Sequence, residues 1–224
     1  MWVKYYAWIY FFHELVFRGT LKDNDIFWDI GANVGVYSLY AANKGHLVLS
    51  FEPSPSNYYL LSRNIEINKL DNKIAGYCIA LNETTKLDVF YMSNTDLGGA
   101  LNSFGEATDW QGKLFNASLK QAMVGYSVDD FIKKFEPPFP THIKIDVDGI
   151  EDKIVKGSKN TLADNRLKSV LIELDTERLE YCKEVLMLLE QAGFKLFKKE
   201  HAPEFDKGKF SFVYNHFFVR PEYK

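Results

Sequence analysis

The sequence of 224 residues is 46% hydrophobic and 25% charged, and it carries a net charge of −3. This composition is typical of a globular domain and excludes a chain that is disordered throughout. The small negative charge and the lack of a long basic run exclude the charge pattern of nucleic-acid-binding proteins, so no nucleic-acid partner is expected. Two isolated cysteines, Cys78 and Cys182, form neither a disulfide framework nor a zinc site, which favours a cytoplasmic protein.

The first element is an aromatic segment at the N-terminus. Its apolar run, residues 7–16, is interrupted by His13 and Glu14, is too short to span a bilayer and lacks a signal-peptide cleavage site. We therefore expect no transmembrane segment here, and predict a helical segment over residues 1–24 that precedes the main domain. This helix could cap the sheet or rest on a membrane surface or a partner, and the lack of a Lys/Arg-rich polar face favours capping.

Strands and helices then alternate regularly. Short apolar runs that stop at Gly or Pro predict strands, and apolar residues spaced three or four apart predict helices. The predicted strands are residues 26–30, 47–51 and 74–80, and the predicted helices are 34–43 and 57–68. This alternation is typical of βαβ units and a parallel sheet.

The alternation is interrupted in the middle of the chain and then resumes. A strand is predicted at 86–92, no regular structure at 93–125, and a short helix at 128–135 that ends before two prolines. Strands at 142–147 and 169–174 then alternate with helices at 150–162 and 177–191. The last two strands, 194–199 and 210–219, are joined by a turn region and are expected to pair antiparallel. Residues 25–224 are therefore predicted to form one α/β domain with a doubly wound, mostly parallel sheet of about seven strands.

The first motif with chemical meaning runs from Asp29 to Gly35, where a strand turns into a helix. Gly31 permits a tight turn, Gly35 permits close approach to the first helical turn, and Asp29 can accept hydrogen bonds from an ammonium group. A nicotinamide fingerprint would need glycines where Asn33 and Val36 stand. The spacing instead favours a ligand with an amino-acid end and no diphosphate.

The second motif is Glu52, which follows the second strand in the segment Phe51-Glu52-Pro53. An acidic residue about 20 positions after the first glycine accepts hydrogen bonds from ribose hydroxyls in α/β nucleotide sites. Together the two motifs predict a site for an adenosine ligand.

The third motif is HIKIDVDGIE, residues 142–151, in which polar and apolar residues alternate along a predicted strand. The alternation places His142, Lys144 and Asp146 on one face, and Asp146 and Asp148 at the carboxyl end of the strand. The glycine comes too early for a calcium-binding loop of the EF-hand type.

These segments together resemble the FkbM-type methyltransferases over about residues 25–219. The resemblance is carried by FWDIGANVGVYSLYAA, FEPSPSNYYLL, HIKIDVDGIEDKIVKGS and SVLIELD, with weaker support from IALNE and YSVDDFI. It implies a class I methyltransferase fold, which is Rossmann-like, with strand order 3-2-1-4-5-7-6 and an antiparallel last strand. It also implies S-adenosylmethionine as cofactor and S-adenosylhomocysteine as product.

The resemblance further implies roles for individual residues. The methionine end of the cofactor would be held by Asp29, Gly31, Asn33 and Gly35, and the ribose by Glu52. The adenine would be flanked by Ala80 to Asn82, and the methyl group would lie near Asp146. Asp148 stands where many members carry glutamate, so its carboxylate arm is shorter.

The function predicted from these features is O-methylation of a sugar, glycan or related small polar acceptor. Asp146 or Asp148 is the candidate general base, with His142 or a bound metal in reserve, since a carboxylate pair could recruit Mg²⁺. No residues are assigned as metal ligands. The polar segment 93–125 is expected to help form the acceptor site, and the acceptor itself and the oligomeric state are not identified by the sequence.

Two alternatives remain open at this point. A nicotinamide-dependent oxidoreductase would share the strand and the ribose-binding acid but would need the third glycine. A non-catalytic protein that binds an adenosine ligand could keep the glycines and Glu52, but would have no need of Asp146 and Asp148.

Overall fold

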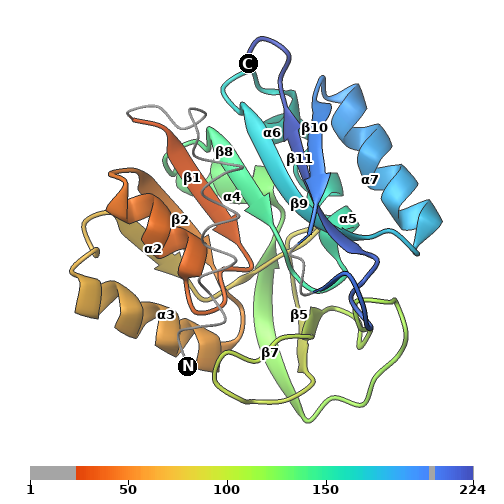
Figure 1. Ribbon diagram of the computed structural model, residues 1–224. Coiled ribbons are helices and arrows are strands. Elements are labelled where there is room, and N and C mark those ends of the chain that lie inside the picture. Colours follow the sequence, from red (N-terminus) through yellow and green to blue (C-terminus); the bar gives the residue numbers. More distant parts are fainter. Residues whose placement is uncertain (1–23, 202–204, 224) are drawn as a thin grey trace.

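A seven-stranded sheet runs through the computed structural model, which describes residues 24–201 and 205–223 (Figure 1). Its strands are β1 (Ile26–Ile30), β2 (Leu47–Phe51), β3 (Ile74–Tyr77), β8 (His142–Ile145), β9 (Ser169–Asp175), β10 (Lys195–Glu200) and β11 (Val213–Val219). The order across the sheet is β3-β2-β1-β8-β9-β11-β10. Strand β11 runs antiparallel to both of its neighbours, and the other neighbouring pairs are parallel. The predicted strand order and antiparallel last strand are confirmed.

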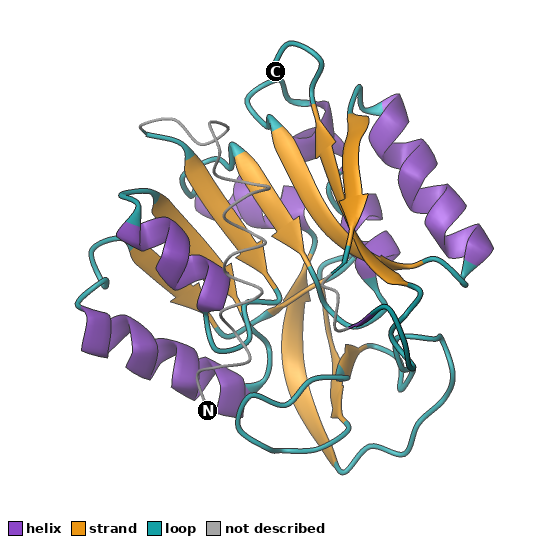
Figure 2. Cartoon of the chain, in the orientation of Figure 1, coloured by secondary structure: helices purple, strands orange, loops and turns teal. Residues whose placement is uncertain are grey.

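Helices cover both faces of this sheet (Figure 2). One face carries α2 (Val36–Asn43) and α3 (Pro55–Asn68), and the other carries α4 (Val128–Phe135), α5 (Glu151–Lys156), α6 (Lys159–Ala163) and α7 (Leu179–Gln191). Neighbouring residues of β1 show why both faces need covering. Phe27 packs in the core beneath α2 and α3, whereas the adjacent Trp28 packs in the core beneath α4 to α7. A parallel sheet with two apolar faces is stable only as a central layer.

A second, four-stranded sheet is inserted between the third and fourth strands of the main sheet. It contains β4 (Ala80–Leu81), β5 (Lys86–Met92), β6 (Ser103–Phe104) and β7 (Leu119–Tyr126), in the order β4-β7-β5-β6. The prediction of a single strand at 74–80 is therefore wrong, because the chain leaves the main sheet after Tyr77. The prediction that 93–125 lacks regular structure is also wrong. Strand β7 was not predicted because its first half, Leu119 to Ala122, is largely solvent-exposed and lacks a strict alternation of polar and apolar residues.

The predicted helix at 150–162 is two helices, α5 and α6, interrupted at Gly157 and Ser158. The second helix starts afresh because the carboxylate of Asp129 accepts hydrogen bonds from the backbone N–H groups of Asn160 and Thr161. Of the helices that the structure describes, none is long and apolar enough to cross a membrane. The predicted aromatic helix over residues 1–24 lies almost entirely outside the described residues.

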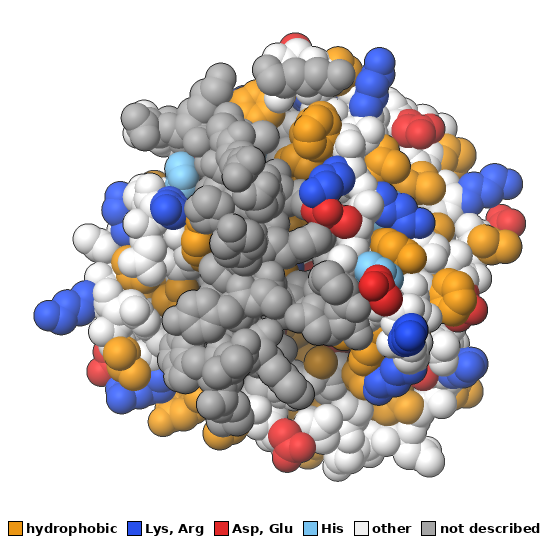
Figure 3. Space-filling model, in the orientation of Figure 1, with side chains coloured by type: hydrophobic (Ala, Val, Ile, Leu, Met, Phe, Trp, Pro, Cys, Tyr) orange, Lys and Arg blue, Asp and Glu red, His pale blue; other side chains and the backbone are white. Residues whose placement is uncertain are grey.

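On the face of the molecule shown in Figure 3, the acidic and basic side chains of the described residues are intermixed. No broad patch of a single sign appears among them in this view. Association with this part of the surface therefore gains little from long-range electrostatic attraction.

Candidate functional site

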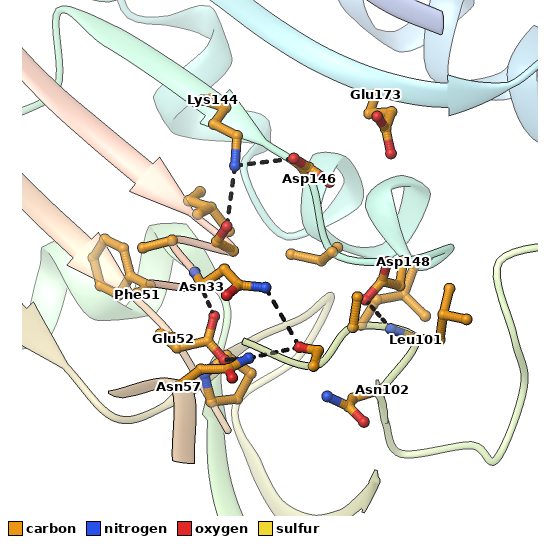
Figure 4. Close-up of a pocket in the computed structure, with 18 of the residues that line it drawn as sticks. Asn33, Phe51, Glu52, Asn57, Leu101, Asn102, Lys144, Asp146, Asp148 and Glu173 are labelled. Atoms are coloured by element: carbon orange, nitrogen blue, oxygen red, sulfur yellow. Dashed lines mark hydrogen bonds and ion pairs between the residues drawn. The ribbon is translucent and has the colours of Figure 1, made fainter. Parts of the chain in front are cut away.

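A cavity of about 470 Å³ lies at the carboxyl ends of β1, β2, β8 and β9, and the second sheet closes it from the other side. Polar and charged side chains from several elements face it (Figure 4). The residues expected at the site that line it are Gly31, Asn33, Glu52, Ala80, Asp146 and Asp148. A crevice beyond the carboxyl ends of the strands is the usual ligand position in doubly wound folds.

The turn after β1 is shaped by close contact with the neighbouring strand. Gly31 adopts a positive φ of 79°, and a β-carbon there would stand 1.8 Å from the carbonyl oxygen of Asp146. The N–H groups of Gly31 and Ala32 both donate to the carbonyl of Phe51 at 3.0 Å. This turn is therefore tied to both neighbouring strands and leaves no room for a side chain at position 31.

Asp29 and Gly35 do not line the cavity. The Asp29 side chain is fully buried, and its Oδ2 accepts hydrogen bonds from the Ser38 backbone N–H at 3.1 Å and hydroxyl at 2.6 Å. Gly35 caps α2 with a φ of 89°, and a β-carbon there would stand 2.5 Å from the Leu61 side chain. Both residues therefore hold supporting positions behind the turn, and their contact with the cofactor stays a prediction.

Glu52 follows β2 and is almost completely buried. Its Oε2 accepts a hydrogen bond from the Asn33 backbone N–H at 2.8 Å, and its Oε1 accepts one from the Ser54 N–H at 2.9 Å. Burial raises the pKa of the carboxyl to about 7, although the hydrogen bonds from Ser54 and Asn33 oppose the rise. Oε1 also accepts a long hydrogen bond from Asn57 Nδ2 at 3.5 Å, so Oε2 has the most room for a ribose hydroxyl.

A loop of the insertion, residues 94–102, spans the cavity. The Asn57 side chain accepts a hydrogen bond from the Gly98 N–H at 2.9 Å and donates one to the Gly99 carbonyl at 2.8 Å. Further along, the Leu101 N–H donates to the carboxylate of Asp148 at 2.6 Å. The loop therefore connects the surroundings of Glu52 with the third motif. Asn57 holds this loop by hydrogen bonds, a role that was not predicted from the sequence.

Lys144 on β8 is buried among three oxygen-bearing partners. Its Nζ lies 3.1 Å from Asp146 Oδ2 and 3.0 Å from the carbonyl oxygen of Gly31 (Figure 4). It also lies 3.3 Å from Asp29 Oδ1. Burial alone would lower the pKa of its ammonium group, but the carboxylates of Asp146 and Asp29 outweigh this and raise it. Lys144 is therefore a fixed cation that holds Asp146 and the glycine turn together.

Asp148 and Glu173 lie at the end of the cavity away from Glu52 (Figure 4). Asp148 adopts a φ of 62°, a conformation that short Asp and Asn side chains tolerate better than most. Burial, together with the charge of Asp146, raises its pKa to about 7. Burial and the neighbouring acids also raise the pKa of Glu173 well above its usual value.

Glu173 was missed in the sequence. It is the lone acidic residue inside the apolar run of β9, SVLIELD, before the strand ends at Asp175. An acid in an otherwise buried strand was the available signal, because such a group is unfavourable unless it faces a polar site.

His142 does not line the cavity, so its prediction as a reserve base is wrong. It is buried at the start of β8, where its ring nitrogens lie 3.0 Å from Asp25 Oδ2 and 2.7 Å from the Ser169 hydroxyl. Burial lowers the pKa of the ring. Within residues 24–201 and 205–223, no group of three or more His, Cys, Asp and Glu side chains is arranged to hold a metal ion.

The cavity residues fit an adenosine ligand with an amino-acid end. Glu52 offers acceptors for ribose hydroxyls, and the apolar segment from Ile79 to Leu81 offers a surface for a base. The Oδ1 atom of Asn33 is buried and has no hydrogen-bond partner among the described residues, so it is available to a donor such as an ammonium group.

Comparisons with known proteins agree with this geometry. A family model of the methyltransferase FkbM domain matches residues 29–196. The chain is 25% identical over 155 residues to the hexuronic acid methyltransferase AglP of Haloferax volcanii, covering 68% of this chain and 57% of that protein. It is 28% identical over 160 residues to the methyltransferase sdnD of Sordaria araneosa, covering 62% of each. The chain thus spans less than two thirds of the length of these curated relatives.

Solved structures share the fold. The methyltransferase FkbM of Methylobacillus flagellatus KT superposes with a TM-score of 0.59 at 17% identity, covering 94% of this chain and 50% of that one. The METTL16 MTase domain superposes with a TM-score of 0.52 at 14% identity, covering 95% and 66%. With the matched family domain covering most of the sequence and the class I methyltransferase fold in place, the chain belongs to the FkbM methyltransferase family.

Proposed function

We propose that this protein transfers the methyl group of S-adenosylmethionine to a hydroxyl of a sugar or related small polar acceptor. One observation carries the proposal. A single cavity has at one end Glu52, a buried carboxyl group that can accept hydrogen bonds from ribose hydroxyls, and at the other end Asp148, a carboxyl group of raised pKa. Membership of the FkbM family supports the reaction class. The name of the Haloferax relative, a hexuronic acid methyltransferase, supports a carbohydrate acceptor.

The cofactor-binding end is assigned to residues near β1 and β2. Glu52 accepts hydrogen bonds from the ribose hydroxyls, and Asn33 and the backbone around Gly31 bind the methionine end. Ala80 and its neighbours lie against the adenine. When bound, the cofactor supplies a methyl carbon on a positively charged sulfur. The protein then has to align the acceptor with that carbon, a contribution of roughly 7–11 kcal/mol in well-oriented reactions.

Asp148 is a better candidate for the general base than Asp146. A general base is most effective when its pKa lies near the working pH, and the pKa of Asp148 is about 7. The carboxylate of Asp146 is instead paired with Lys144 at 3.1 Å. We assign Asp146 to positioning and charge near the methyl group, and Asp148 to removal of the hydroxyl proton.

The acceptor end continues beyond Leu101 into a second cavity of about 480 Å³. Leu101 lines both cavities, and Trp110, Phe115 and Phe212 line the second one. Aromatic side chains contact the apolar faces of sugar rings, and nearby polar groups accept their hydroxyls. This supports the expectation that the 93–125 segment helps to form the acceptor site.

The proposal is tested with methyl-labelled S-adenosylmethionine and a panel of methyl glycosides, with the product identified by mass spectrometry. We expect label in the glycoside and S-adenosylhomocysteine as co-product. Tight binding of S-adenosylhomocysteine without transfer to any glycoside would favour the non-catalytic alternative. Exchange of the 93–125 segment for that of a relative should change acceptor choice while cofactor affinity is kept; loss of cofactor binding alone would contradict the assignment of the segment.

The oxidoreductase alternative is less consistent with the cavity. The Val36 side chain lines it at the position where a dinucleotide site has its third glycine. Calorimetric titration with NADH and with S-adenosylmethionine separates the two. We expect heat of binding only from the latter.

A further inference from the structure

Three carboxyl groups converge on the end of the cavity that faces away from Glu52. Asp146 and Asp148 follow β8, and Glu173 lies near the end of β9, the neighbouring strand. All three line the same cavity, and Figure 4 shows them on one side of it. The charges of Asp146, Asp148 and the nearby Glu151 contribute to the raised pKa of Glu173, after burial, so these groups interact electrostatically.

Lys144 and Arg178, two cationic side chains near this end of the cavity, already contact oxygen atoms of the protein. Lys144 is the one Lys or Arg among the described residues that line the cavity, and it contacts Asp29, Asp146 and the Gly31 carbonyl. Arg178 does not line the cavity. Its Nη1 donates to the carbonyl oxygens of Gly149 at 2.8 Å and Trp110 at 3.1 Å. Among the described residues that line this cavity, an acceptor carboxylate would therefore find no free ammonium or guanidinium group, since Lys209 lines the second cavity and His201 pairs with Asp206 at 3.1 Å.

The acidic side chains at this end differ in how many hydrogen bonds their carboxyl oxygens already accept within the protein. Glu151 accepts hydrogen bonds from the backbone of Val147 and Gly149 and from the Tyr181 hydroxyl, so it serves the fold. Asp148 accepts hydrogen bonds from the backbone N–H groups of Leu101 and Asn102. Glu173 has no hydrogen-bond donor among the described residues. Asp148 and Glu173 are therefore the groups with capacity left for a ligand.

The wall beside Glu173 comes from the neighbouring strand β11, on which Asn215 is its register partner, and from the loop before that strand. Phe210 and Val213 give it an apolar surface, and Asn215 gives it an amide. A polyhydroxylated ring would donate its hydroxyls to the carboxylates and rest an apolar edge on this wall.

We propose that the acceptor carries no negative charge next to its reacting hydroxyl, and that Asp148 and Glu173 exclude acceptors that do. The inference rests on the proposed methyl transfer and narrows its substrate class to neutral or amine-bearing polyols. Above the pH at which these two groups lose their protons, carboxylates without a balancing cation repel an anion, and a positive group in the same place is attracted. The acceptor would thus differ in charge from the hexuronic acid in the name of the Haloferax relative.

The test uses analogues of S-adenosylhomocysteine in which nitrogen replaces sulfur and carries a third arm that points into the acceptor end. Three arms are compared by calorimetry at pH 8.5: 2-hydroxyethyl, 2-aminoethyl and carboxymethyl. We expect the carboxymethyl analogue to bind at least about tenfold more weakly than the hydroxyethyl one, a difference of about 1.4 kcal/mol. The aminoethyl analogue should bind at least as tightly as the hydroxyethyl one. The test needs no knowledge of the natural acceptor.

Variants identify which carboxyl groups weaken the binding of the carboxymethyl analogue. In Glu173→Gln and in Asp148→Asn the penalty on the carboxymethyl arm should shrink, and in the double variant it should nearly vanish. Glu190→Gln removes a solvent-exposed carboxylate on α7 and should behave as the wild type. S-adenosylhomocysteine itself reports whether each variant still folds, and if none of them binds it, the wild-type ranking alone decides.

The outcomes separate the two proposals. Equal or tighter binding of the carboxymethyl analogue by the wild type would overturn the charge inference while leaving methyl transfer intact. Failure of S-adenosylhomocysteine and of every analogue to bind would overturn the proposed function, and the charge inference with it.

Discussion

Gly31 lies against the backbone of Asp146 so closely that a β-carbon at position 31 would stand 1.8 Å from the Asp146 carbonyl oxygen. The glycine turn after one strand and the acidic motif after its neighbour are therefore one packed unit. Separate sequence motifs become a single site because parallel strands end at the same edge of the sheet.

The contact between Gly31 and Asp146 predicts how much a methyl side chain at position 31 would destabilise the folded protein. Gly31→Ala should lower the free energy of unfolding by about 3 kcal/mol or more, because it adds a backbone clash to a left-handed conformation. Gly45→Ala is the matched control, since Gly45 has a φ of 100° with open space around it. It should cost only about 1–2 kcal/mol. Urea unfolding of both variants measures the difference, and equal losses would mean that the contact with Asp146 is unimportant.

The pKa of Glu52 predicts how stability depends on pH. The folded protein keeps the Glu52 proton up to about pH 7, whereas the unfolded chain loses it near 4.5. Stability from this group is therefore fully present below pH 4.5 and is lost as the pH rises through 7. Relative to Glu52→Gln, the ligand-free wild type should lose up to about 3 kcal/mol between these limits.

Urea unfolding of the two proteins at pH 4.5 and pH 8 measures this change. Glu190→Gln, at an exposed position, should show the same difference from the wild type at both pH values. A Glu52→Gln difference that is also independent of pH would show that the carboxyl is not perturbed by burial.

The assignment of Asp148 predicts a pH–rate profile. A base must be unprotonated to accept a proton, so kcat/KM should rise with pH and level off above about 7. Asp148→Asn should remove this rising limb and lower kcat/KM by about 10²- to 10⁴-fold. Steady-state rates measured from pH 5.5 to 9 with an active acceptor would check both. An unchanged rising limb in the variant would assign the proton transfer to another group.

The ion pair between Lys144 and Asp29 predicts that removal of the ammonium group lowers the stability of the protein. Lys144→Met leaves Asp29 buried without its cation and should destabilise the protein by about 3–5 kcal/mol. Lys183→Met, at an exposed position on α7, should have little effect. Thermal or urea unfolding compares the two. A small loss in Lys144→Met would mean that water replaces the ammonium group.

The central strands β1, β2, β8 and β9 could be predicted from the sequence because they are short, mostly buried runs bounded by Gly, Pro or Asp. The same ends carry Gly31, Glu52, Asp146 and Asp148, so these four residues could be predicted to meet at one edge of the sheet. The second sheet was harder, because half of β7 is exposed and its strand pairs with β5 across a long loop. Long-range pairing of this kind leaves little trace in local periodicity.

The supporting contacts were also hidden. Nothing in the order of residues indicates that Lys144 contacts Asp29, since the two lie on neighbouring strands more than a hundred residues apart. Asp29 and Gly35 belong to the motif by sequence, yet they pack behind it. Whether a polar residue faces a ligand or a neighbour depends on the three-dimensional packing, which a linear motif does not contain.

The most direct test is a calorimetric titration of S-adenosylhomocysteine into the wild-type protein and into Glu52→Ala. We predict one binding site in the wild type and at least about tenfold weaker binding in the variant, because a charge-assisted hydrogen bond to the ribose contributes about 1.5–3 kcal/mol. Absence of binding to the wild type, or equal affinity of the two proteins, would contradict the assignment of this cavity to the cofactor.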